Sequence, residues 1–77
     1  MTKEERAKKE FFTKKYDEVI RQIAVAEDKD MSVAEDMLKY EIRVRLGMQK
    51  REDVYKGIPE DFDWKTAEAD YMELIKK

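Results

Sequence analysis

Apolar residues recur every three or four positions along three stretches of this chain, which is the spacing of amphipathic helices. The first stretch starts at a capping box formed by Thr2 and Glu5, and the last starts at Asp61 or Asp63. These patterns predict an all-α fold, a small bundle of three principal helices over residues 3–27, 33–46 and 62–76. The expected core residues are Phe12, Tyr16, Val19, Ile23, Met37, Leu38, Trp64, Tyr71 and Leu74.

Local signals set the bounds of the middle helix. Ser32, with Glu35 three residues later, predicts its N-cap, and Gly47 predicts the left-handed residue that ends it. Beyond Gly47, a weak helical spacing predicts a short fourth helical turn near 49–56, which Gly57 would end.

Residues 40–46 alternate between apolar and charged side chains, which is also the pattern of a half-buried strand. A strand would need a partner, and Val54-Tyr55 could form only a marginal hairpin with it. As a helix, the segment carries two adjacent apolar rows, Val33/Met37/Tyr40/Val44 and Ala34/Leu38/Ile42/Leu46. We favour the helix, whose broad apolar arc suggests self-association or a groove for a partner.

On that helix Glu41 and Arg45 fall within the apolar arc, four residues apart. Both side chains could reach the edge of the arc and pair in solvent, which is the interpretation we favour. The alternative is an ion pair inside an apolar interface, where it would fix register or partner choice.

A chain of 77 residues predicts a single helical domain, 1–77, whose residues 1–10 fray or project because few of them are apolar. The absence of cysteine and histidine excludes disulfides, thiolate metal sites and histidine-based catalysis. The acidic segment 27–32 lacks calcium-loop spacing, with Val33 and Lys39 where glycine and glutamate are required. We expect a cytoplasmic protein without a membrane segment, and no enzyme, cofactor or metal.

Basic residues cluster at Arg43, Arg45, Lys50 and Arg51, within a chain of net charge −2. Together with the basic N-terminal turns, this cluster is the alternative hypothesis of a nucleic-acid-binding module. Pairing with acidic blocks of the same chain is the interpretation that we favour for it.

Acidic and large aromatic residues alternate from Glu60 to Trp64. Phe62 and Trp64 could anchor a partner, because aromatic side chains dominate interface hot spots. The alternative, which we favour, is that the acids cap the last helix and the aromatics close the core.

The residues Asp53-Val54-Tyr55-Lys56-Gly57-Ile58-Pro59, with Trp64 shortly after, resemble the end of the Hha/YmoA family. The resemblance implies a small helical protein that modulates a nucleoid-structuring protein by binding it. It covers residues 53–64 alone, the tail beyond Trp64 is longer than that family's pattern, and no residue role is carried across.

The sequence thus favours a non-enzymatic regulator or inhibitor, such as a phage- or plasmid-type accessory protein, that binds a protein partner or a second copy of itself. The expected partner-binding residues are Tyr40, Glu41, Val44, Arg45, Phe62 and Trp64.

Overall fold

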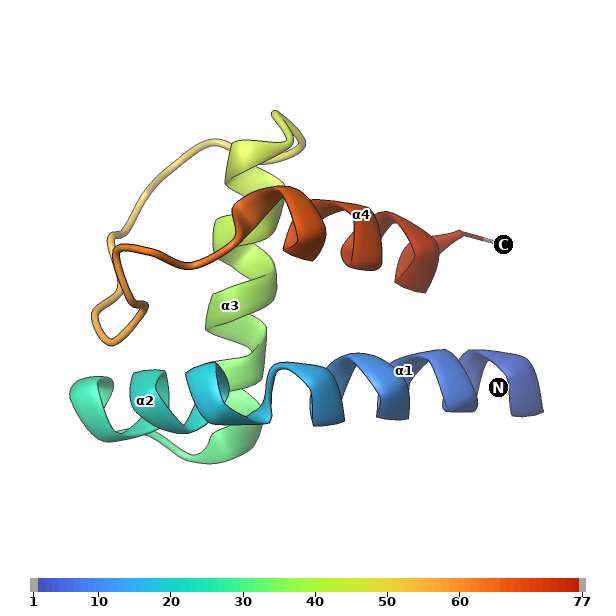
Figure 1. Ribbon diagram of the computed structural model, residues 1–77. Helices are drawn as coiled ribbons and strands as arrows, with labels where there is room; N and C mark the ends of the chain where they lie inside the picture. The colour runs from blue at the N-terminus through green and yellow to red at the C-terminus, as the bar shows by residue number, and fades with distance from the viewer. Residues whose placement is uncertain (1, 77) are drawn as a thin grey trace.

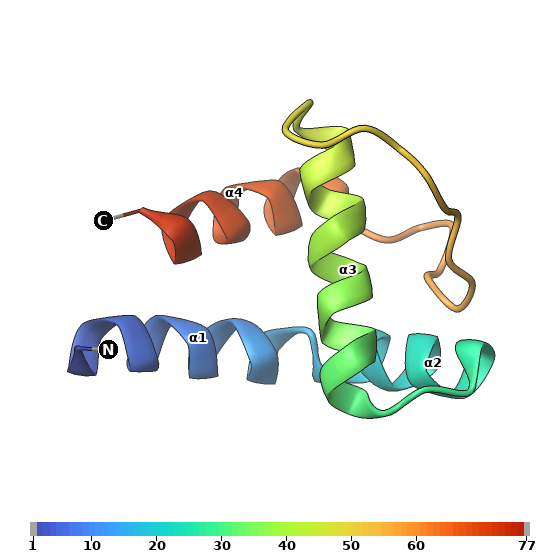
Figure 2. The ribbon, with the colours of Figure 1, turned by 180° about the vertical axis from the view of Figure 1, so that it is seen from behind.

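The computed structural model describes residues 2–76, and four helices make up most of that range (Figure 1). They are α1 (Lys3–Lys15), α2 (Asp17–Glu27), α3 (Met31–Arg45) and α4 (Trp64–Ile75). Residues 2–76 contain no strand, so the predicted all-α class is confirmed. α1 and α2 follow nearly one line, α3 crosses them, and α4 runs back beside α1 (Figure 2).

The helix predicted over 3–27 is divided at Tyr16, whose backbone (φ −105°, ψ 17°) departs from helical values. The Tyr16 N–H still bonds to the Phe12 carbonyl, and the Ile20 N–H bonds to the Tyr16 carbonyl. These bonds across the break keep α2 nearly in line with α1. No glycine or proline marks the position, which explains why the apolar spacing predicted one unbroken helix.

The alternating residues 40–46 form the last turns of α3 and its C-cap, which confirms the helical interpretation. The helix begins at Met31 after an N-cap at Asp30, so the predicted cap at Ser32 is wrong. The physical reason is the tight end of α2, where Asp28 adopts a left-handed conformation (φ 54°). The chain has therefore already reversed when it reaches Asp30, and α3 starts two residues earlier than predicted.

Gly47 ends α3 as predicted, in the left-handed conformation (φ 77°). Its N–H bonds to the Val44 carbonyl at 3.1 Å, and the Met48 N–H bonds to the Arg43 carbonyl at 2.9 Å. This pair of bonds is the Schellman motif, which satisfies carbonyls that the helix leaves free.

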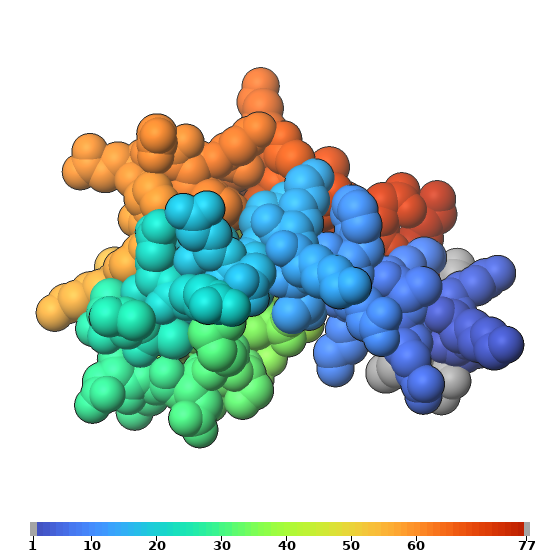
Figure 3. All heavy atoms as spheres, turned by 60° about the horizontal axis from the view of Figure 1, so that its bottom comes forward, coloured from blue at the N-terminus to red at the C-terminus, as the bar shows by residue number. Residues whose placement is uncertain are grey.

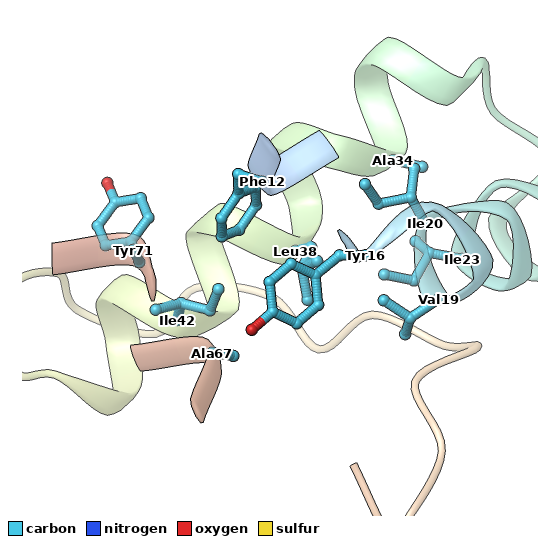
Figure 4. Packing of buried hydrophobic residues seen from close by; sticks show 10 residues of the cluster. All are labelled: Phe12, Tyr16, Val19, Ile20, Ile23, Ala34, Leu38, Ile42, Ala67 and Tyr71. Atoms are coloured by element: carbon cyan, nitrogen blue, oxygen red, sulfur yellow. The ribbon is translucent and has the colours of Figure 1, made fainter. Parts of the chain in front are cut away.

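The hydrophobic core forms where α3 crosses the other helices (Figure 4). Six of the predicted core residues are buried: Phe12, Tyr16, Val19, Ile23, Leu38 and Tyr71. The other three, Met37, Trp64 and Leu74, are partly buried and pack against that cluster. Ile42, in the alternating segment, is fully buried between α3 and α4.

Residues 48–63, here called the connecting segment, join α3 to α4 without regular helix, so the helical turn predicted near 49–56 is wrong. Two successive N–H groups within residues 49–56 bond to a side chain rather than to carbonyls of the same stretch. The Tyr40 hydroxyl accepts from the N–H of Glu52 at 2.5 Å and of Asp53 at 3.1 Å. A helical turn would need these same donors for its own ladder.

The second half of the connecting segment lies against α2. The Glu27 carboxylate accepts from the Lys56 N–H at 2.6 Å. Gly57 has a φ of 97°, and a Cβ atom there would lie 2.5 Å from the Gln22 carbonyl oxygen and 2.8 Å from the Ile23 Cα. Only glycine therefore allows the segment to approach the α2 backbone this closely.

The connecting segment also covers α3 at Tyr40 and Glu41. Tyr40 is buried beneath it, with the Tyr55 ring edge-on at 5.4 Å between centroids. Glu41 is 5% exposed and receives two hydrogen bonds from the Arg51 guanidinium, whereas Arg45 Nε lies 3.9 Å from its carboxylate. Glu41 therefore does not pair with Arg45 in solvent, and its closest ion-pair partner, Arg51, belongs to the same chain. Self-association of the protein stays a prediction.

Candidate protein-binding groove

An open groove lies between the α1–α2 junction and the chain from Pro59 to Thr66. Figure 3 views the molecule from the side of α1 and α2, with the end of the connecting segment (orange) directly beside the junction (light blue). The groove encloses about 460 Å³. Its apolar lining comes from Tyr16, Val19, Pro59 and Phe62, and its polar lining from Lys15, Glu18, Gln22, Asp61, Asp63 and Thr66.

Tyr16 fixes one side of the groove. Its position at the break between α1 and α2 turns its ring against Phe12 (centroids 4.8 Å apart) and Phe62 (5.9 Å). Its hydroxyl donates to Asp70 Oδ2 at 2.5 Å. Burial, together with this hydrogen bond, raises the pKa of the Tyr16 hydroxyl above its ordinary value, so the hydroxyl keeps its proton at neutral pH.

Asp70 of α4 holds both α1 and Tyr16 in place. Besides the Tyr16 hydroxyl, Lys15 Nζ lies 2.7 Å from Asp70 Oδ2. Burial alone would raise the pKa of Asp70, but the hydrogen bonds from Lys15 and Tyr16 hold it below its ordinary value. The carboxylate is therefore ionised at neutral pH, and Lys15 has its counter-charge within the chain.

The other side of the groove is a short turn followed by the start of α4. The Phe62 N–H bonds to the Pro59 carbonyl at 3.2 Å, and Asp63 then caps α4 by accepting from the Thr66 N–H at 3.1 Å. The Thr66 hydroxyl also donates to Asp63 at 2.5 Å, and these bonds hold the pKa of Asp63 below its ordinary value. The cap thereby fixes Phe62 at the groove and keeps a negative charge beside it.

A row of stacked side chains leads away from the groove towards α3. The Phe62 and Trp64 rings meet edge to face at 4.7 Å between centroids, and the Arg45 guanidinium lies 3.9 Å from the Trp64 ring centre. Arg45 in turn faces Glu41 at 3.9 Å. The groove and the buried carboxylate of α3 are therefore connected through continuous contacts.

The structure divides the six predicted partner-binding residues into two groups. Glu41, Arg45, Trp64 and Phe62 form the row just described. Tyr40 is buried beneath the connecting segment, and Val44 is half-buried. Only Phe62 among the six lines the groove.

The predicted nucleic-acid residues have mostly intramolecular contacts. Arg43 donates to Gln49 at 2.8 Å and to the Tyr71 hydroxyl at 3.2 Å. Arg51 pairs with Glu41, Arg45 stacks on Trp64, and Lys50 is exposed.

Sequence reasoning did not identify Glu18, Gln22 and the Lys15–Asp70 pair as parts of a site. Lys15 and Asp70 are 55 positions apart in sequence, so no local pattern links them. One signal was available: Asp17 and Glu18 are the acidic first turn of a new helix, which could have revealed the break at Tyr16.

Within residues 2–76, no group of three acidic side chains is arranged to hold a metal ion. No helix in this range is both long and apolar enough to cross a membrane. Comparison of the chain with protein-family models, with curated proteins and with solved structures finds no match.

Proposed function

We propose that this protein is a small non-enzymatic regulator or inhibitor that acts by binding a protein partner in the groove. The observation that carries the proposal is the open groove itself, lined by Tyr16, Val19 and Phe62 and held in shape by the Tyr16–Asp70 and Asp63–Thr66 hydrogen bonds. A preformed apolar groove that ends in a fixed aromatic side chain suits the insertion of a partner's side chain.

The polar groups around the groove support binding rather than catalysis. The Tyr16 hydroxyl is a poor nucleophile because its pKa is raised and its proton is held by Asp70. Asp63 and Asp70 have lowered pKa values and accept hydrogen bonds from Thr66 and Lys15, which disfavours them as general bases.

The test is quantitative affinity capture with the wild-type chain and two variants of α2. Gln22→Phe places a large ring in the groove from an exposed position on its rim. Val25→Phe, the matched control, places the same ring on the same helix outside the groove, at a side chain that is 83% exposed. We expect a specific protein partner that wild type and Val25→Phe retain and that Gln22→Phe loses.

Circular dichroism should show the same helical content and thermal unfolding for all three chains. With that established, the proposal fails if no specific protein is retained. It also fails if Gln22→Phe retains the same partner as wild type.

Nucleic-acid binding is the second candidate, and one surface favours it. Arg6, Lys9 and Lys14 line a hollow along α1 together with Glu10 and Thr13, and within residues 2–76 none of the three bases has an ion-pair partner. Binding there would give strongly salt-dependent retardation of DNA or RNA, weakened by charge reversal at Arg6 and Lys9. Retardation that depends on Arg43 and Arg51 instead would place the site at the basic cluster at the end of α3 and the start of the connecting segment.

A further inference from the structure

The charged side chains around the groove are mainly acidic. The groove lining contains three acids, Glu18, Asp61 and Asp63, and one base, Lys15. The Lys15 ammonium is already paired with the Asp70 carboxylate at 2.7 Å. Glu18 and Asp61 are exposed, and neither has an ion-pair or hydrogen-bond partner among residues 2–76. The groove therefore presents negative charge that the described part of the chain does not neutralise.

These acids flank the groove from two different elements. Glu18 lies in the first turn of α2, while Asp61 and Asp63 lie on the opposite side, around the start of α4. Between them lie the apolar side chains of Tyr16, Val19 and Phe62. A ligand that enters the groove would thus contact apolar surface at its centre and carboxylates on both sides.

We infer that the groove binds a lysine- or arginine-rich segment of the partner protein, with a single aliphatic or aromatic side chain between its basic residues. The apolar side chain lies against Tyr16, Val19 and Phe62, and the basic residues on either side reach Glu18 and Asp61. This inference rests on the proposed function, and it specifies the chemistry of the partner segment through charge complementarity.

The probe is a short synthetic peptide in which lysines flank one leucine, titrated into the intact protein. Trp64, the one tryptophan of the chain, touches Phe62 and reports binding through its fluorescence. Two control peptides separate the contributions: one has glutamates in place of the lysines, and the other has serine in place of leucine. We expect binding of the lysine–leucine peptide, weaker binding of the serine peptide and no binding of the glutamate peptide.

Three double variants of the protein locate the site of the peptide. Glu18→Lys combined with Asp61→Lys should weaken binding about tenfold or more at low ionic strength, because two attractions become repulsions at exposed positions. Glu18→Gln with Asp61→Asn, which preserves side-chain shape, should have an intermediate effect. Asp36→Lys combined with Glu68→Lys changes net charge equally at positions outside the groove lining and should leave binding nearly unchanged.

The inference is overturned if the glutamate peptide binds as well as the lysine peptide, or if the charge-reversed groove binds as wild type does. Equal weakening by the control reversal would also overturn it, because net charge alone would then explain the effect. The proposed function is tested separately: a captured partner that Gln22→Phe loses, but that the charge-reversed groove retains, would refute the basic segment and leave the groove as the binding site.

Discussion

Replacing Gly57 by alanine should separate the connecting segment from α2. At a φ of 97° an alanine is strained by about 1–2 kcal/mol. Its Cβ would also lie 2.5 Å from the Gln22 carbonyl oxygen. This overlap is between backbone atoms of the segment and of α2, so it is relieved only if the connecting segment moves away from α2. The shift would break the bond from the Lys56 N–H to Glu27, which contributes roughly 1 kcal/mol. The expected loss of unfolding free energy is about 2–4 kcal/mol.

Gly47 provides the matched control for this substitution. Its φ of 77° is also left-handed, but a Cβ atom there would meet nothing within 4 Å. Gly47→Ala should therefore cost only the backbone strain, about 1 kcal/mol. In a chain of this size, thermal unfolding followed by circular dichroism should show a Tm lower by roughly 8–30 °C for Gly57→Ala and by about 4–8 °C for Gly47→Ala. Equal losses in the two variants would refute the close contact as the cause.

Three further predictions concern single side chains. Asp28→Gly should raise the unfolding free energy by about 0.5 kcal/mol in urea titrations, because Asp28 holds a φ of 54° at the end of α2; unchanged stability would contradict this. Tyr40→Phe should cost about 1–3 kcal/mol by removing the acceptor of two N–H groups, whereas Tyr55→Phe, which keeps the ring contact, should cost little. The pKa of Asp70 is lower in the folded than in the unfolded chain, so its stabilising effect is present above about pH 4 and is lost as the pH falls through the folded value. The stability difference between wild type and Asp70→Asn should therefore shrink below about pH 4 in acid unfolding, and a constant difference would contradict the assignment.

The helices were predictable because their signals are local. The apolar spacing identified all the helical regions of residues 2–76. The end of α3 was predictable from Gly47 alone, because glycine favours the left-handed conformation that ends a helix. Residues 40–46 show where spacing alone is ambiguous: the decision for a helix needed the argument that no strand partner was available. The start of α3 was missed because the left-handed Asp28 gave no strong sequence signal for a tight turn.

The connecting segment and the groove were not predictable from the sequence because they depend on contacts between distant residues. The Tyr40 hydroxyl accepts hydrogen bonds from the N–H groups of Glu52 and Asp53. These bonds compete with the bonds of a helical turn, and the spacing of residues 49–56 does not reveal them. Likewise, Phe62 was recognised as a possible anchor, but Tyr16, with which it lines the groove, is 46 positions away in sequence.

The connecting segment is held by hydrogen bonds, one ion pair, the close approach of Gly57 and the packing of Ile58 and Phe62 on the core, but most of its side chains are exposed. A segment held in this way opens at lower free energy than helices packed around a core. Its last residues also form one side of the groove. A partner bound in the groove, as proposed, would therefore stabilise the state in which the segment lies against the helices. Occupancy of the groove and burial of Glu41 beneath Arg51 are therefore thermodynamically linked, and a bound partner should slow amide hydrogen exchange at Glu52 and Asp53, on the far part of the same segment.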